Sequence, residues 1–387
     1  MKTPSPSKAR LGKTSFITIL AVALLVAGCS TQGTASKTPS QENVPNNTVI
    51  DKYGTITATK GPKGEAPINA VSLQLTDGEI AQIKSGKHRV AILWHELSAW
   101  SKAIQDGMVD EFKTLGVTVT ATGDAKFDAA TQANQIQSAL ATKPEVILGQ
   151  AVDPATGGAA YQPAVDAGVK LVFADQAPNG YVYGKQYQAI LTDDLFQVGI
   201  HAGEAMCKAV GNKGEVAILY YDADFHVTNF RDAAFAQTVK DQCPDVKIVS
   251  KKGFSDPNKA EEIANAIIAK HPNLSGIYTS WAVPAQGVLA ALKSAGNTST
   301  KIVTIDLDDT IATDMVTPGG HTAAIIVDSA YKYGKAMAVA AALSMLGKPA
   351  PEYGVSDVTT VTKSNIAEGY KAWNQTVPKA VSDAEKN

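Results

Sequence analysis

The hydrophobic pattern of the chain changes from irregular and polar to a regular alternation at about residue 89. Beyond that point, short runs rich in β-branched residues are separated by longer stretches in which apolar residues recur every three or four positions. The short runs predict buried strands and the longer stretches predict amphipathic helices, an order typical of a parallel α/β sheet with crossover helices. The expected strands are Val90–Trp94, Val117–Ala121, Val146–Gly149, Lys170–Ala174, Gln188–Leu191, Glu215–Tyr220, Lys247–Lys251, Gly276–Thr279, Lys301–Asp306 and Thr322–Val327.

So many strands indicate two lobes. Two sets of four to five βα units, divided near residues 192–196, exceed what one sheet of ordinary size holds. A helix over about 331–346 and a strand near 359–362 are expected to return between the lobes. The expected domains are an N-terminal extension at 67–88, an N-terminal lobe of 89–193 plus 329–356, and a C-terminal lobe of 194–328 plus 357–387. Within the extension, a Thr76–Glu79 capping box predicts the start of a short helix that runs to about Lys84. A single larger α/β enzyme is the alternative.

The first 28 residues have the pattern of an export signal. Four basic residues precede an apolar run over 16–28, which is shorter than the roughly 20 residues of a membrane span but suits a signal-peptide core. The segment Val26–Cys29 resembles the lipobox of bacterial lipoproteins, where the cysteine is lipidated and becomes the mature N-terminus. That resemblance implies a lipid anchor on Cys29. An ordinary signal peptide with an incidental Cys29 is the alternative.

Removal of this leader changes the charge of the chain. The full sequence has 35 Lys+Arg and 37 Asp+Glu, and losing four basic and no acidic residues shifts its formal charge from −2 to −6. A mildly acidic protein without a clustered basic block is not expected to bind nucleic acid. Residues 29–66 are rich in Ser, Thr, Pro, Asn, Gln and Gly, and their weak apolar periodicity predicts a flexible tether.

Export also affects the interpretation of the two other cysteines. In an oxidising compartment Cys207 and Cys243 are expected to be paired. Each lies near the C-terminal end of a predicted helix, so a disulfide would join neighbouring helices. Spacing alone does not establish that their Cα atoms are close enough.

The motifs of several enzyme classes are missing from the sequence. It has no Gly-x-Gly-x-x-Gly after the first strand, no Walker-type phosphate loop and no Gly-x-Ser-x-Gly elbow. The six histidines show no metal-ligand spacing. The acidic pairs Asp193-Asp194 and Asp308-Asp309 are expected to cap helices, because adjacent side chains rarely face each other. Catalysis, a metal and a cofactor are therefore not expected.

Polar and aromatic residues instead gather directly after strand ends, where open α/β sheets bind ligands. Carboxylates, amides and a guanidinium can hold hydroxyl groups in networks, while aromatic rings stack on the C–H face of a sugar. This combination suits a polyhydroxylated ligand. The candidate binding residues are His95, Ser98, Trp100, Ser101, Asp175, Gln176, Asn229, Arg231, Phe254, Trp281, Asp306 and Asp328.

From Arg89 to about Thr362 the chain resembles the periplasmic sugar-binding proteins of the ribose-binding type, the solute receptors of ABC importers. The resemblance implies two Rossmann-like lobes, each a mostly parallel sheet flanked by helices, joined by a multi-strand hinge. It also implies that Arg231 and Asp306 bind the ligand and that Phe254 stacks on it. The matching segments are Ala91–Gly107, Val169–Gln176, Thr228–Phe235, the Gly-Phe-Ser-Asp-Pro segment at 253–257, and Ile302–Asp306.

Three positions depart from the ribose-binding pattern. Gln176 replaces an arginine, Trp281 an amide and Asp328 a glutamine. These changes remove a positive charge, add a negative charge and add ring area, so ribose itself is not assumed. An uncharged sugar or polyol is expected, and a cationic or aminated ligand remains open.

Several candidates also have a purely structural interpretation. Trp100 could belong to a helix core, and His95 could lie on the surface. Asp175 and Asp306 could cap the next helix, a frequent use of Asp after a strand. Arg231 could form a surface ion pair.

Together these features predict a monomeric, lipid-tethered receptor that closes on a small sugar or polyol and delivers it to an ABC permease in the membrane. It would work in a periplasm or on the outer face of the cell. The main alternative is a ligand sensor of the same fold that signals to a membrane protein. A gene regulator is disfavoured because no helix-turn-helix precedes residue 89, and an exported hydrolase would require turnover.

Overall fold

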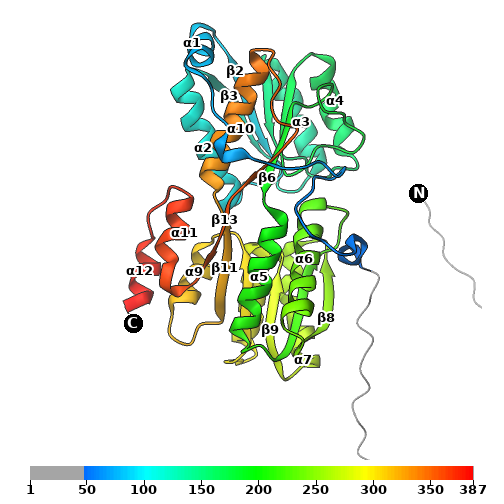
Figure 1. The fold of residues 1–387 in the computed structure, drawn as a ribbon, viewed down its shortest axis with the longest axis vertical. Coiled ribbons are helices and arrows are strands. Elements are labelled where there is room, and N and C mark those ends of the chain that lie inside the picture. Colours follow the sequence, from blue (N-terminus) through cyan, green and yellow to red (C-terminus); the bar gives the residue numbers. More distant parts are fainter. Residues whose placement is uncertain (1–47, 387) are drawn as a thin grey trace, which may run out of the picture. The chain divides into compact units, whose positions relative to one another are not determined.

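The computed structural model describes residues 48–386, which form two α/β lobes, each built on one sheet (Figure 1). The predicted leader and Cys29 lie outside the described residues. The first sheet is parallel throughout and has the order β1 (Ile68–Asn69), β12 (Tyr353–Ser356), β6 (Ala189–Asp193), β5 (Lys170–Ala174), β4 (Val146–Gly149), β2 (Arg89–Trp94) and β3 (Thr118–Asp124). The α/β fold of two mostly parallel sheets predicted from the sequence is confirmed.

The second sheet repeats this arrangement. Its order is β13 (Val358–Val361), β11 (Thr322–Asp328), β10 (Lys301–Ile305), β9 (Leu274–Thr279), β7 (Gly214–Tyr221) and β8 (Val246–Phe254). Only β13 is antiparallel to its neighbour, β11. The central strands of both sheets are buried on both faces, which explains their continuous apolar runs.

The helices follow the strands in the crossover pattern. They are α1 (Asp77–Ser85), α2 (Ala99–Leu115), α3 (Ala129–Ala141), α4 (Gly157–Asp166), α5 (Leu195–Ala209), α6 (His226–Gln242), α7 (Ala260–Lys270), α8 (Ala282–Ser294), α9 (Asp309–Val316), α10 (Ala330–Met345), α11 (Ile366–Ala372) and α12 (Lys379–Lys386). The capping box of Thr76 and Glu79 opens α1, as its sequence predicts.

Three chain segments pass from one sheet to the other. One lies between β6 and α5, one between β11 and α10, and one between β12 and β13, where only Asp357 separates the strands. The sequence predicts a single return strand near 359–362, whereas the structure has two short strands, one in each sheet. β12 was missed because its Tyr-Gly-Val-Ser sequence has no apolar run and contains glycine.

Glycines allow two helix pairs to pack at close range. A methyl group on Gly107 of α2 or Gly334 of α10 would overlap a backbone carbonyl of the other helix. Gly199 and Gly203 have the same role in α5, where a Cβ on Gly199 would lie 2.7 Å from the carbonyl oxygen of Arg231 in α6. The α5–α6 contact therefore fixes the backbone that carries Arg231.

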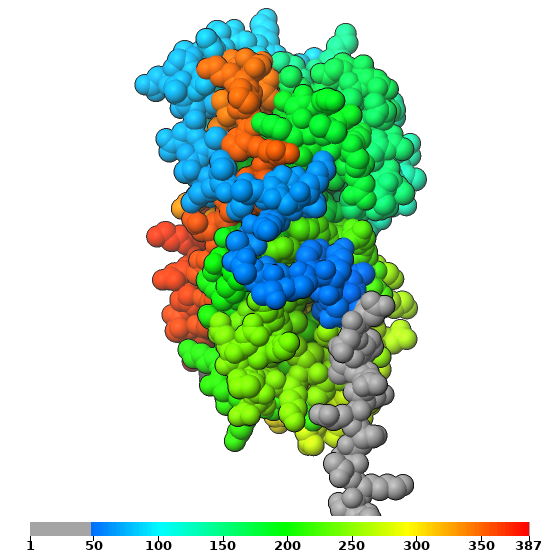
Figure 2. All heavy atoms as spheres, turned by 45° about the vertical axis from the view of Figure 1, so that its right-hand side comes forward, coloured from blue at the N-terminus to red at the C-terminus, as the bar shows by residue number. Residues whose placement is uncertain are grey.

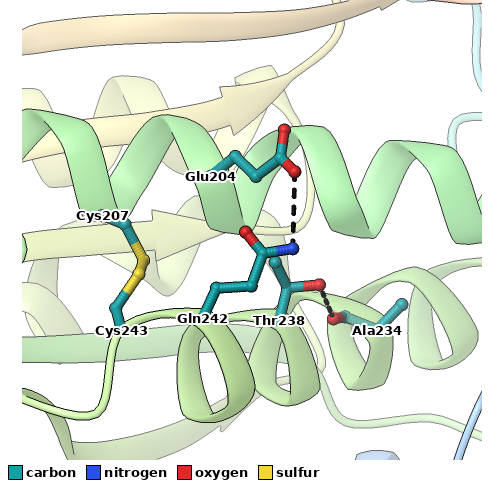
Figure 3. Close-up of a disulfide and its surroundings, with 6 residues drawn as sticks. All are labelled: Glu204, Cys207, Ala234, Thr238, Gln242 and Cys243. Carbon is teal, nitrogen blue, oxygen red and sulfur yellow. Dashed lines mark hydrogen bonds between the residues drawn. A yellow bond between two sulfur atoms is a disulfide. The ribbon is translucent and has the colours of Figure 1, made fainter.

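A disulfide joins these two helices at their other end (Figure 3). Cys207 lies in the last turn of α5 and Cys243 directly follows α6, with their Cα atoms 6.2 Å apart. The Cys207–Cys243 disulfide that we predicted for an oxidising compartment is thus present. Nearby, the Gln242 side chain donates a hydrogen bond to Glu204 across the same interface (3.4 Å).

The flexible tether predicted for 29–66 is wrong for residues 48–66, which pack on the folded body as a strap (Figure 2). The 3-10 helix Val49–Tyr53 lies against α6, and Ile50 and Ile56 are only 3% and 5% exposed. Side chains then anchor the strap to both lobes: Thr59 donates to Asp194, and Lys63 donates to the carbonyl of Tyr181. A few well-placed apolar residues fix this polar segment, and periodicity cannot reveal them.

We predict that Gly199→Ala destabilises the protein by about 1–3 kcal/mol, because the added methyl group overpacks the α5–α6 contact. Urea denaturation followed by circular dichroism measures the change. Gly78→Ala is the matched control: its Cβ meets nothing within 4 Å, so the substitution in α1 should be neutral or slightly stabilising. Equal stability of both variants would contradict the packing argument.

Candidate functional site

A cavity lies between the two sheets at the carboxyl ends of their strands. It offers about 70 Å³ to the centres of water-sized molecules. Since one water needs about 10–15 Å³ on this measure, the cavity has room for a small polar molecule. Its lining residues are His95, Glu96, Ser98, Trp100, Phe127, Gln150, Val152, Asp175, Tyr221, Phe225, Val227, Thr228, Arg231, Trp281 and Asp306.

Asp175 and Asp306 occupy equivalent places in the two sheets. Asp175 follows β5 and Asp306 follows β10, and both have left-handed backbones with φ of 63° and 69°. Aspartate tolerates this conformation better than most residues, and two such sites at strand ends are typical of functional positions. Neither caps a helix, because Asp194 and Asp308 cap the helices that follow. The capping alternative is therefore wrong for both residues.

Burial makes both carboxyls weaker acids. Burial raises the pKa of Asp175 to about 7, and the negative charge of Asp193 adds to this effect. Asp175 accepts hydrogen bonds from Gln150 and Thr192, each 2.9 Å long. Burial also raises the pKa of Asp306 to about 7, although the charge of Arg231 opposes the shift.

Arg231 lies in the second turn of α6 and is 7% exposed. Its Nη1 is 3.5 Å from Asp193 of the first sheet, and its Nη2 donates to the carbonyl of Ser280 after β9 at 2.6 Å. Arg231 therefore forms a buried ion pair, and the alternative of a surface ion pair is wrong. Asp193 does not cap a helix, contrary to expectation, since the cap is Asp194 alone.

Asp328 ends β11 and lies beside the cavity, 4% exposed. Its Oδ2 accepts a hydrogen bond from Nε1 of Trp100 at 3.2 Å, and none of the residues over 48–386 donates a hydrogen bond to its Oδ1. Burial and the charges of Asp193 and Asp306 raise its pKa well above the ordinary value. Trp100 therefore lines the cavity with its ring while its indole N–H reaches the carboxylate behind it.

Aromatic rings form much of the remaining wall. Tyr221 lies edge-on to Trp281, with ring centroids 5.5 Å apart. Phe254 was expected to stack on the ligand but does not line the cavity; it is buried behind these two rings, 5.1 Å from Trp281. On the other sheet, Phe127 packs edge-on against His95 at 5.0 Å. Burial lowers the pKa of His95 to about 4, which leaves its ring neutral at neutral pH.

Three further candidates hold the structure around the cavity and do not line it. Ser101 forms a capping box with Ser98 at the start of α2, and only Ser98 reaches the cavity. Gln176 accepts a hydrogen bond from the backbone N–H of His226, the first residue of α6, and so links the two lobes. Asn229 donates to the carbonyl of Ala223, which fixes the loop before that helix.

Some lining residues were not among the candidates from sequence. Gln150 directly follows β4, so its position was a usable signal. Phe127 was missed because the strand expected at 117–121 ends three residues too early, at Ala121 instead of Asp124. The other lining residues outside the candidate set are Glu96 and Val152, together with Tyr221, Phe225, Val227 and Thr228 from the polar and aromatic run that leads to Arg231.

Within residues 48–386, no group of three or more His, Cys, Asp or Glu side chains could hold a metal ion. Over the same residues, every helix is too short or too polar to cross a membrane. The charged and aromatic groups that line the cavity are carboxylates, one guanidinium, one neutral imidazole and several aromatic rings.

We predict that Asp175→Asn stabilises the ligand-free protein more at pH 8 than at pH 5. The pKa of Asp175 is about 7 in the folded chain, against an ordinary value of 3.8. The side chain therefore contributes fully to the free energy of unfolding below about pH 4, and this contribution is lost as the pH rises through 7. Asparagine removes the charge that is unfavourable above pH 7. Arg231, Asp193, Asp306 and Thr192 face this carboxyl and stay unchanged in the variant.

Thermal unfolding at the two pH values measures this difference, at roughly 2–4 °C per kcal/mol. The exposed Asp245, outside the cavity, supplies the control, Asp245→Asn, which makes the same change in charge. A melting temperature of Asp175→Asn that follows the wild type in parallel from pH 5 to 8 would contradict the burial argument.

Comparison with known proteins gives the chain a family. A profile described as a periplasmic binding protein domain matches residues 90–349. A candidate rhizopine-binding protein from Rhizobium meliloti is 23% identical over 267 residues, which cover 68% of this chain and 86% of that protein. The xylitol-binding protein of Mycolicibacterium smegmatis is 24% identical over 307 residues, or 78% of this chain and 85% of that protein.

A solved structure shows the same fold. An ABC transporter solute-binding protein from Agrobacterium vitis, bound with α-D-tagatopyranose, aligns with a TM-score of 0.68 at 20% identity and covers 76% of this chain and 100% of its own. At this identity the likeness shows the fold alone. Because the profile match spans more than half of the sequence, the chain belongs to the periplasmic binding protein family.

Proposed function

We propose that the protein is the receptor of an ABC importer and captures a small sugar or polyol between its two lobes. The observation that carries this proposal is the cavity itself, where Asp175 and Asp306 from the two sheets and Arg231 from α6 line one space with tryptophan and tyrosine rings. Hydroxyl groups can donate to the carboxylates and accept from the guanidinium. The names of the xylitol-binding relative and of the tagatose-bound structure support the same ligand class.

The chain would bind its ligand without making or breaking a bond. Ligand contacts from both lobes would favour a closed arrangement over an open one, by hinge bending at the three crossing segments. Trp100 and Trp281 lie on opposite lobes and would cover the apolar face of the ligand. The closed form would then be recognised by a membrane permease.

The N-terminal sequence supports export and anchoring as part of this proposal. The leader over 1–28 would be removed, and a lipid on Cys29 would hold the monomeric receptor to the membrane. The strap over residues 48–66 is the described segment that lies nearest in sequence to this anchor. The protein would then act close to the permease that it supplies.

We predict that a panel of pentoses, hexoses and their polyols contains at least one compound that raises the melting temperature of the protein in scanning fluorimetry. Asp306→Asn should weaken binding of that compound roughly 10- to 100-fold, because it removes a charged acceptor from the cavity. Arg231→Lys keeps the charge but loses the forked donors, and should weaken it at least as much.

The exposed substitution Asp245→Asn, outside the cavity and the crossing segments, should leave the ligand-induced shift unchanged. Circular dichroism of each variant separates loss of binding from loss of folding. Full binding by folded Asp306→Asn and Arg231→Lys would show that this cavity is not the ligand site.

We further predict that Cys29→Ser releases the protein from the membrane fraction of the host, because serine lacks the thiol that accepts the lipid. Detergent phase partitioning of the wild type and the variant measures this change. Cys207→Ser is the matched cysteine control and should stay in the detergent phase, since its thiol belongs to the disulfide. Partitioning of Cys29→Ser with the wild type would contradict the anchor.

A further inference from the structure

Acidic side chains outnumber basic ones around the cavity. Four aspartates end or follow strands around it: Asp175, Asp193, Asp306 and Asp328. Within the described residues, Arg231 is the only cation that forms an ion pair with any of them. Its charge is matched by Asp193, so three carboxyls remain without a cationic partner.

Asp175, Asp306 and Asp328 receive different numbers of hydrogen bonds from the protein. Asp175 receives two, from Gln150 and Thr192. Asp328 receives one, from Trp100, and its second oxygen is buried with no partner in the described part of the chain. Asp306 lines the cavity and accepts no side-chain hydrogen bond from any described residue. A buried carboxylate oxygen without a partner, such as Oδ1 of Asp328, costs several kcal/mol unless a ligand compensates it.

The carboxyls also act on one another. The charges of Asp193 and Asp306 raise the pKa of both Asp175 and Asp328, so the group holds protons more strongly than a single buried acid would. A neutral sugar can satisfy single lone pairs but cannot offset this repulsion. An ammonium group offers three donors and a positive charge at one point.

The walls of the cavity suit the same group. The rings of Trp100, Trp281 and Tyr221 line it together with Asp306. Faces of tryptophan and tyrosine attract cations, most strongly where water is excluded. Carboxylates at the strand ends with aromatic walls around them thus match a cation that also carries hydroxyls.

We infer that the ligand is a sugar or polyol bearing a protonated amine, and that Asp306, with Asp175 from the other sheet, receives the amine. This inference rests on the proposed receptor function and specifies its ligand class. Asp328, behind Trp100, would act on the amine only through its electrostatic coupling to Asp306, without touching the ligand directly.

Isothermal calorimetry at pH 7 with matched probe pairs tests the inference. The pairs are D-glucose with D-glucosamine, and sorbitol with 1-amino-1-deoxysorbitol, extended to pentoses and pentitols with their amino-deoxy derivatives. In at least one pair the amine should bind ten or more times more tightly than the neutral member. N-acetylation of that amine, which removes its charge, should abolish the advantage, and methylamine alone should not bind because it lacks the hydroxyl groups.

Variants then locate the amine. In Asp306→Asn the ratio of amine to neutral affinity should fall at least threefold, and Asp328→Asn should lower it less. An unchanged ratio in Asp306→Asn would overturn the assignment of the amine to that residue. The exposed Asp245→Asn, outside the cavity and the crossing segments, controls for a general change in net charge.

The outcomes separate this inference from the proposed function. If neutral members bind as tightly as their amines or more tightly, the amine is wrong and the receptor function stands. If no compound in either set binds, the receptor function itself is overturned.

Discussion

The buried ion pair of Arg231 and Asp193 is the interaction on which the candidate site depends. Arg231 belongs to a helix of one lobe and Asp193 ends a strand of the other, so the pair spans the junction of the two sheets. The second arm of the guanidinium binds the carbonyl of Ser280, which fixes the side chain from a third element. Removing either charge would leave the other buried and unpaired, which costs about 3–5 kcal/mol.

The acidic character of the cavity follows from the repeated architecture. The strands occupy corresponding places in the two sheets, β5 with β10 and β6 with β11. Asp175 and Asp306 follow the first pair, while Asp193 and Asp328 end the second. Each of these two strand positions thus carries an aspartate in both lobes, which gives four carboxyls, whereas Arg231 comes from one lobe only. The charge imbalance is thus built into the way the fold places strand ends.

The sequence predicts those parts of the fold and site that depend on local pattern. Buried strands appear as apolar runs, and Asp175, Asp306 and Trp281 were found because they follow such runs. The strap and β12 were missed because long-range contacts stabilise them, as the burial of Ile50 and Ile56 on α6 shows. Ser101 was misplaced for a related reason, since the spacing of a capping box and that of a binding loop look alike until the backbone is known.

The strap adds a fourth connection between the lobes, and His226 is where it meets both of them. The ring of His226 donates from Nε2 to the strap carbonyl of Lys60 at 2.8 Å, while its backbone N–H donates to Gln176 of the other lobe at 3.0 Å. The strap also bonds to Asp194, directly after the Asp193 that pairs with Arg231. Any rotation about the crossing before α5 must therefore move the strap and the ion pair together. Binding in the cavity and the position of the N-terminal strap are coupled through these shared residues.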